Sequence, residues 1–394
     1  MTLDGQFKIT GIRVYTVSSD GDGGDYHRQK NGHWLIDTPI ANPMSAYEAY
    51  RHSRASWGIG VLGSIVVEIE CAGGQVGVAT GFGGPPACWL IKNHFSRFLL
   101  GADARQVNLI WDQLFRASMF YGRKGMPIAA ISVVDLALWD LIGKVRQEPV
   151  YNLIGGKCRE QIDFYCTGPR PEAVKALGFI GGKVPLPYGP ADGENGVRRN
   201  VAFLTEHREA VGPGFPLMVD CYMSLTVPYA IRLAEQCKKL DIYWWEEVLH
   251  PDDVEGYALL KQAHPTLKWT TGEHEYTRYG FRRLIEGRQI DILQPDVMWV
   301  GGLTELLRIA AHASAYDLPV VPHGSGPYSY HFNISQPIAP FCEYIAASPD
   351  GRSVLPVFGK LFTGEAMPVD GKMSAPAGPG FGMHIADRTM LLEA

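Results

Sequence analysis

From about residue 160 onward, short apolar runs alternate along the chain with longer amphipathic segments. The runs are apolar enough to be buried on both faces, as the strands of a parallel sheet are. There are eight of them, at 162–166, 179–184, 216–219, 242–245, 268–271, 291–293, 319–321 and 341–345. Of the segments between them, 228–240 and 303–316 have apolar residues at helical spacing, and Pro228 suits the first turn of a helix.

Eight strands that alternate with helices predict a (β/α)₈-type barrel, which is an α/β fold. A doubly wound sheet would show the same alternation. It would, however, carry a glycine-rich phosphate-binding turn after its first strand, and no such turn follows 162–166.

The first 150 residues have a different pattern. The β-branched run 64–70, the pair Gly73–Gly74 and the segment 75–80 predict a β-hairpin. Segment 128–142 predicts a helix that Gly143 ends. Its apolar face consists of Ile128, Ile131, Val134, Leu138, Leu141 and Ile142. A strand-rich start followed by helices predicts an α+β unit over 1–150.

Composition narrows the class of protein. Of the 394 residues, 46% are hydrophobic and 20% are charged, which is typical of a soluble globular protein. The net charge of −5 argues against a nucleic-acid partner, and no run of about 18 apolar residues predicts a membrane span. Seven cysteines without a C-x-x-C pair support neither a disulfide framework nor a thiolate zinc site. We therefore expect a cytoplasmic protein.

Ionisable residues lie at or near the ends of six consecutive predicted strands. They are spaced 20 to 27 residues apart, about one strand–helix unit each: Asp220, Glu246, Glu273, Asp296, His323 and Glu343. In a barrel these side chains gather at the C-terminal mouth, where barrel enzymes have their active sites. Asp220, Glu246 and Glu273 would repel one another unless a cation neutralised them. Oxygen-only ligation suits Mg²⁺, for which Mn²⁺ can substitute; the alternative for each acid alone is a salt bridge at the barrel mouth.

The pair Asp296 and His323 has the pattern of a general base. A carboxylate that holds one imidazole nitrogen fixes the tautomer and raises the basicity of the ring. Glu343 could donate a hydrogen bond if it retains its proton, or it could form a surface ion pair. Trp299, just beyond Asp296, is a candidate for lining the pocket, whereas Trp244 and Trp245 are expected in the core.

The chain resembles the enolase superfamily, whose members use a Lys or His base and Mg²⁺, and within it the branch of L-rhamnonate dehydratases. The likeness covers essentially the whole chain. It rests on the segments 31–39 (NGHWLIDTP), 181–185 (GGKVP), 219–224 (VDCYMS), 245–247 (WEE), 271–274 (TGEH), 294–296 (QPD) and 321–325 (VPHGS).

The resemblance implies an N-terminal α+β capping domain at 1–150, a barrel at 151–355 and a tail at 356–394 that returns to complete the cap. It implies that Asp220, Glu246 and Glu273 bind Mg²⁺, that the Asp296–His323 dyad is the base, and that Glu343 stabilises an enediolate. It also implies four substrate-binding residues: His33, Arg54, Lys183 and His274. Many members of the superfamily have Lys-x-Lys where this chain has Lys183-Val-Pro185. Proline cannot take a proton, which favours one-base dehydration over two-base racemisation.

Together these residues predict Mg²⁺-dependent dehydration of an acid sugar. The resemblance favours L-rhamnonate, converted to 2-keto-3-deoxy-L-rhamnonate and water, with His323 taking the C2 proton and protonating the leaving 3-hydroxyl. L-Lyxonate and L-mannonate stay open as substrates. The rivals are a Schiff-base aldolase that uses Lys183, a serine hydrolase that uses His323 and Ser325, and a non-catalytic binding barrel. The polar loop 24–33 is long enough to act as a lid over the site. The resemblance to the family also implies a homo-oligomer such as an octamer.

Overall fold

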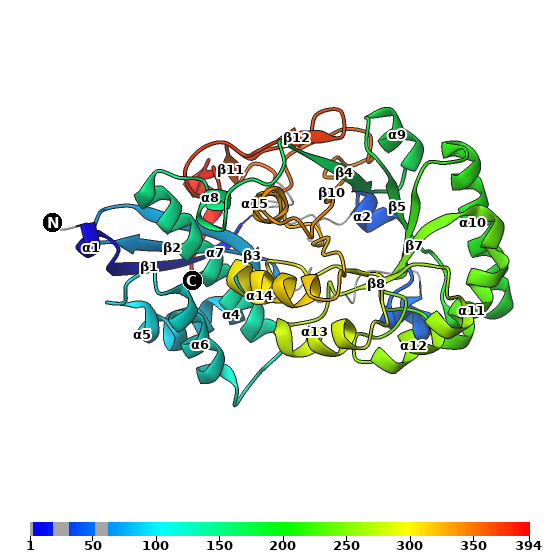
Figure 1. Ribbon diagram of the computed structural model, residues 1–394, viewed down its shortest axis with the longest axis horizontal. Helices are drawn as coiled ribbons and strands as arrows, with labels where there is room; N and C mark the ends of the chain where they lie inside the picture. The colour runs from blue at the N-terminus through cyan, green and yellow to red at the C-terminus, as the bar shows by residue number, and fades with distance from the viewer. Residues whose placement is uncertain (1–2, 19–30, 52–61) are drawn as a thin grey trace.

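The computed structural model describes residues 3–18, 31–51 and 62–394 (Figure 1). Its first sheet is antiparallel, with the order β14-β1-β2-β3. The strands are β1 (Ile9–Val17), β2 (Ser64–Cys71), β3 (Val76–Phe82) and β14 (Leu391–Glu393). The predicted hairpin is confirmed as β2 and β3. The sequence pattern missed β1, because its register shifts between Ile9 and Gly11 and its burial does not alternate regularly.

Helices lie before and after these strands along the chain, and the longest of them packs on β2 and β3. They are α1 (Leu3–Gln6), α4 (Gly84–Leu90), α5 (Ser96–Leu99), α6 (Val107–Ser118), α7 (Met126–Arg146) and α8 (Val150–Leu153). By length and composition α7 could cross a membrane, but 89% of its apolar window is buried inside the protein. It is therefore a core helix.

The prediction that Gly143 ends this helix is wrong, because α7 continues to Arg146. The glycine has a different purpose. A Cβ at Gly143 would lie 2.6 Å from the Cα of Gly380, so only a residue without a side chain lets the C-terminal tail pack directly on the helix.

The second sheet is parallel and curled, with the order β10-β4-β5-β6-β7-β8-β9. Its strands are β4 (Gln161–Thr167), β5 (Gly182–Pro185), β6 (Leu217–Asp220), β7 (Ile242–Glu246), β8 (Trp269–Thr271), β9 (Ile292–Leu293) and β10 (Cys342–Ile345). The strands follow one another in chain order and the last pairs with the first. A doubly wound sheet would instead reverse direction at a switch point. The predicted barrel-type α/β fold is confirmed.

One of the eight predicted runs, 319–321, forms no strand of its own. Val320 makes a single parallel bridge to Leu293, and the Val321 N–H donates to the Leu293 carbonyl at 2.8 Å. Pro319 and Pro322 flank this pair of valines, and neither proline has an N–H for a longer ladder.

Helices follow the strands of the barrel on its outer side (Figure 1). They are α9 (Pro171–Ala176), α10 (Gly193–Val211), α11 (Val227–Gln236), α12 (Val254–Ala263), α13 (Thr277–Glu286), α14 (Gly302–Ser314) and α15 (Pro327–Ser335). Beyond the barrel, β12 (Lys372–Ser374) pairs with β4, β11 (Phe362–Thr363) pairs with β13 (His384–Ile385), and β14 pairs with β1. The tail thus returns to the first sheet, while the exact division at 150 and 355 stays a prediction.

A short helix near the N-terminus lies beside the mouth of the barrel. This helix, α2 (Trp34–Asp37), is seen next to β4, β5 and β10 in Figure 1. The Trp34 indole donates to the Ala346 carbonyl at 2.7 Å, and the Trp34 N–H donates to the Pro349 carbonyl at 2.9 Å. The N-terminal part of the chain therefore reaches the edge at which the parallel strands end.

Candidate active site

Three carboxylates meet at the mouth of the barrel. Asp220 ends β6, Glu246 ends β7 and Glu273 follows β8, and one oxygen from each lies within 4.8 Å of the others. Burial raises the pKa of Glu246 to about 8 and that of Glu273 to about 7, and it also raises the pKa of Asp220. The sequence-predicted cluster is therefore brought together, and without a neutralising charge its members resist ionisation.

The backbone and neighbouring side chains fix the direction of these acids. Glu246 Oε2 accepts hydrogen bonds from the Trp244 indole at 3.0 Å and from the Gln294 amide at 2.6 Å. Gly272, just before Glu273, has φ +136°, and a Cβ there would lie 2.9 Å from the Phe281 ring. Glycine at this position lets β8 end in a turn that directs Glu273 into the barrel mouth.

The donor set fits a hard divalent cation. Within the described parts of the chain, Glu273 Oε2 is buried and has no hydrogen-bond partner, which is costly unless another group satisfies it. Oxygen-only ligation by carboxylates is what Mg²⁺ prefers.

A second group of side chains that could hold a metal ion consists of Glu247, Glu273 and His274. Here His274 Nδ1 lies 2.8 Å from Glu247 Oε2, and the His274 N–H donates to Oε1 at 3.2 Å. Burial alone would lower the pKa of His274, but Glu247 and Glu273 raise it to about 9. Within this second group Glu247 and His274 are therefore paired with each other, and these two residues need no cation.

Lys183 lies among the acids and is almost fully buried. Its Nζ contacts Glu246 directly and lies 2.9 Å from Glu343 Oε1 and 3.7 Å from Asp220 Oδ2. Burial alone would lower the pKa of Lys183, but Glu246 and Glu343 raise it well above its ordinary value. The side chain is thus an ammonium group, whereas a Schiff-base aldolase needs the free amine.

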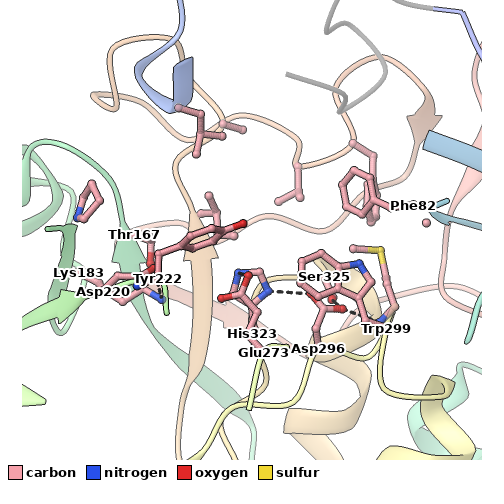
Figure 2. Close-up of a pocket in the computed structure, with 18 of the residues that line it drawn as sticks. Phe82, Thr167, Lys183, Asp220, Tyr222, Glu273, Asp296, Trp299, His323 and Ser325 are labelled. Carbon is pink, nitrogen blue, oxygen red and sulfur yellow. Dashed lines mark hydrogen bonds and ion pairs between the residues drawn. The ribbon is translucent and has the colours of Figure 1, made fainter. Parts of the chain in front are cut away.

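His323 and Asp296 form the predicted dyad (Figure 2). His323 Nδ1 lies 2.7 Å from Asp296 Oδ2, and Nε2 lies 3.3 Å from Glu273 Oε1. The other Asp296 oxygen accepts from the Ser325 hydroxyl at 2.8 Å and from the Met298 N–H at 2.7 Å. Burial alone would lower the pKa of His323, but Glu273 and Asp296 raise it well above its ordinary value. Because the Ser325 hydroxyl donates its hydrogen bond to Asp296, the geometry gives no support to a serine hydrolase.

Glu343 lies on β10 and accepts hydrogen bonds from the Thr167 hydroxyl and, at 2.8 Å, from the Gly324 N–H. Burial alone would raise the pKa of Glu343, but the Lys183 ammonium and His323 lower it to about 2. Of the two possibilities left open for Glu343, a retained proton or an ion pair, this arrangement of charges favours an ion pair with Lys183 that is buried rather than at the surface. Glu343 is then a carboxylate that accepts hydrogen bonds.

A cavity of about 150 Å³ lies between the first sheet and the barrel mouth. It is lined by the site residues Lys183, Asp220, Glu273, Asp296 and His323, by Trp299 as predicted, and by residues that the sequence pattern missed. The missed ones include Trp34, Phe82, Thr167, Tyr222 and Phe358. Three of them carried a signal in the sequence: Trp34 follows His33 in segment 31–39, Thr167 follows the predicted strand 162–166, and Tyr222 lies two residues after Asp220. The Tyr222 N–H donates to Asp220 Oδ1 at 3.0 Å.

Two other residues that were predicted to bind substrate, His33 and His274, are not among the residues that line the cavity. His33 is buried, with Nε2 3.3 Å from the Ala347 carbonyl and Nδ1 accepting from the Leu35 N–H at 3.2 Å. It is not among the cavity-lining residues, although its neighbours Trp34 and Leu35 are. His274 contacts two lining rings, with its own ring centroid 5.3 Å from Tyr222 and 5.2 Å from Trp299.

Arg54 and positions 24–30 of the predicted lid lie outside the described residues. The roles expected of them stay predictions.

Comparison with known families agrees with this geometry. Residues 172–389 match the family described as enolase C-terminal domain-like, and residues 55–155 match the N-terminal domain of mandelate racemase and muconate lactonizing enzyme. The chain belongs to the enolase superfamily. The resemblance seen in the sequence is thereby confirmed.

Several members of the superfamily are similar along nearly their whole length. L-Rhamnonate dehydratase from Saccharopolyspora erythraea is 49% identical over 379 residues, which is 96% of each chain. The crystal structure of rhamnonate dehydratase from Gibberella zeae complexed with Mg has 64% identity and a TM-score of 0.96, and the match covers 98% of this chain and 96% of that one. The 3,6-anhydro-D-galactonate cycloisomerase from Zobellia galactanivorans is more distant, with 28% identity, a TM-score of 0.77 and coverage of 98% and 100%. The prediction that this superfamily member is an enzyme, a hydro-lyase, is confirmed.

Proposed function

We propose that this protein is a Mg²⁺-dependent acid-sugar dehydratase and that L-rhamnonate is its preferred substrate, which it converts to 2-keto-3-deoxy-L-rhamnonate and water. One observation carries the proposal. Asp220 and Glu273, two members of the three-carboxylate cluster, line the same cavity as the Asp296–His323 dyad, with His323 Nε2 3.3 Å from Glu273 Oε1. The relatives named rhamnonate dehydratase, one of them complexed with Mg, support the substrate and the cofactor.

Asp220, Glu246 and Glu273 would hold the Mg²⁺ ion. When bound, the ion acts as a Lewis acid that stabilises the negative charge developing on the substrate carboxylate. Lys183 contributes a second positive charge at the same end of the cavity, within 3.7 Å of Asp220. Glu343 and Glu246 hold its ammonium group in place, so it need not reorganise as the charge develops.

His323 carries out both proton transfers. The C2 hydrogen of an acid sugar is only weakly acidic, because its loss places a second negative charge on the carboxylate. In its neutral form His323 takes this proton at Nε2, while Asp296 holds Nδ1. The resulting imidazolium protonates the leaving 3-hydroxyl on the same face of the substrate. Water leaves, and the enol product tautomerises to the 2-keto-3-deoxy acid.

The test is an assay of 2-keto acid formation from a panel of acid sugars with Mg²⁺, with Mn²⁺ and with EDTA. We expect turnover of L-rhamnonate with either metal and loss of turnover in EDTA. His323→Asn should abolish both dehydration and exchange of the C2 hydrogen with solvent deuterium. Persisting exchange in that variant would show that another residue is the base, and no 2-keto acid from any sugar would refute the proposed function.

L-Lyxonate and L-mannonate remain the alternative substrates, and they belong in the same panel. A cytoplasmic location and a homo-oligomer such as an octamer are part of the proposal. Light scattering of the purified protein tests the oligomeric state.

A further inference from the structure

The cavity has two chemically different ends (Figure 2). Lys183, Asp220 and Thr167 lie at one end, and His323 lies in the middle beside Glu273. Trp299 and Phe82 lie at the other end. The charged Lys183 and Asp220 therefore lie at one end of the cavity, with the Tyr222 ring beside them, and the aromatic Trp299 and Phe82 form the other end.

Aromatic rings continue the wall outward from the base. The ring centroid of Trp299 lies 5.7 Å from that of His323, and the ring centroid of Phe82 lies 6.1 Å from that of Trp299. The apolar side chain of Met298 also lines the cavity and is 5% exposed. Trp299, Phe82 and Met298 are called the distal wall below.

The hydroxyls near the distal wall already have partners. Thr80 Oγ1 donates to the Ile65 carbonyl at 2.9 Å, and Ser325 Oγ donates to Asp296 at 2.8 Å. Ser64 also lines the cavity and is likewise engaged. The side chains of the distal wall thus offer a substrate mainly apolar surface, apart from the indole N–H of Trp299.

The distal wall is held rigidly by the helices of the first unit. Gly301, two residues after Trp299, donates its N–H to the Ser132 hydroxyl at 2.9 Å and accepts from the Trp111 indole at 2.7 Å. Phe82 is the last residue of β3 and pairs with Ser64 of β2. A wall fixed from both units is suited to discriminate between ligand shapes.

The proposed reaction fixes the direction of the substrate in this cavity. The substrate carboxylate belongs at the end where Lys183 and the acids lie, and C2 and C3 must lie at His323. The carbons farthest from the carboxylate then lie along Trp299 toward Phe82. We propose that the distal wall is the subsite for the C6 methyl group of a 6-deoxy acid sugar. It would be what makes L-rhamnonate the preferred substrate.

This inference rests on the proposed function and deepens it. L-Lyxonate lacks C6, and L-mannonate carries a hydroxyl there. A missing methyl group in an apolar pocket lowers kcat/KM about 10- to 200-fold, and an added hydroxyl in a mainly apolar pocket lowers it on the order of 100-fold. We therefore expect the native enzyme to prefer L-rhamnonate to both acids by factors of this size.

Variants of Phe82 test the subsite. Phe82→Ala should reduce both preferences several-fold, because it removes much of the apolar surface at C6, whereas Phe82→Leu keeps an apolar side chain and should retain most of them. The matched control is Phe120→Ala, because Phe120 is 98% exposed. This substitution should leave the preferences for L-rhamnonate over L-lyxonate and over L-mannonate unchanged. Thermal melting of every variant checks that it is folded.

Binding measurements separate this inference from the proposed function. Calorimetry on His323→Asn with Mg²⁺, alone and combined with Phe82→Ala, gives the Kd of each acid without turnover. The same preferences should occur in Kd and shrink when Phe82 is replaced. The subsite is refuted if a folded Phe82→Ala enzyme keeps both ratios, or if the native enzyme treats the three acids alike. Failure of all three acids to be dehydrated refutes the proposed function instead, and the Kd series still decides the subsite.

Discussion

Replacing Lys183 by Met should destabilise the metal-free protein strongly. Its ammonium group contacts Glu246, lies 2.9 Å from Glu343 and is almost fully buried, so its removal leaves buried carboxylates uncompensated. Breaking a buried ion pair in this way costs about 3 to 5 kcal/mol. With an unfolding entropy of about 2.1 cal/mol/K per residue over the 394 residues, that cost lowers Tm by roughly 4 to 6 °C.

The assay is thermal unfolding in EDTA of native protein, Lys183→Met and a control, Lys157→Met. Lys157 pairs with Glu160 at 2.6 Å, but both side chains are exposed to solvent, so its loss should change the stability little. Mg²⁺ should restore part of the stability of Lys183→Met, because an ion that binds only the folded state stabilises it. A Tm in EDTA no lower than that of Lys157→Met would refute the reasoning, since it would mean that Lys183 does not neutralise the acids.

Two further predictions concern the base and the tail. Asp296→Asn should lower kcat about 100-fold or more in the 2-keto acid assay, because the amide no longer stabilises an imidazolium at His323; an unchanged kcat would contradict the assigned dyad. The carboxylate of Glu365 accepts from the N–H groups of Val357 and Phe358, and burial raises its pKa to about 7. The folded state then binds this proton more tightly than the unfolded state, so stability should fall by about 3 kcal/mol as the pH rises from 4.5 to 7. The Tm of Glu365→Gln should fall less over this range, and parallel curves for the variant and the native protein would contradict the assignment.

The sequence could predict the barrel end of the site because one rule connects position to geometry. The carboxyl ends of parallel strands meet at one mouth, so the spacing of Asp220, Glu246 and Glu273 was enough to bring them together. The same rule paired Asp296 with His323. It succeeded at His323 even though 319–321 forms only a bridge, because the bridge to Leu293 still fixes the direction of the segment.

The parts that sequence could not predict depend on contacts between distant segments. Phe82 reaches the cavity only because the first sheet packs against the barrel mouth, and no spacing along the chain encodes that packing. The choice between a retained proton and an ion pair at Glu343 was left open for a similar reason. Its pKa depends on an ammonium group 2.9 Å away that comes from β5, a strand more than 150 residues earlier in the sequence.

One-base dehydration places a demand on His323 that racemisation does not. In the proposed reaction the same imidazole takes the proton from C2 and gives it to the leaving 3-hydroxyl, so its ring must keep its place while its charge changes. Asp296, which follows β9, holds Nδ1 of His323. Asp296 is itself held by hydrogen bonds from the Ser325 hydroxyl and the Met298 N–H, so the imidazole keeps its place. A second base would have to face His323 across the substrate. The lysine expected for it in many relatives is Pro185 here, which has no group that can take a proton. The rigid dyad and the proline together favour loss of the 3-hydroxyl over inversion at C2.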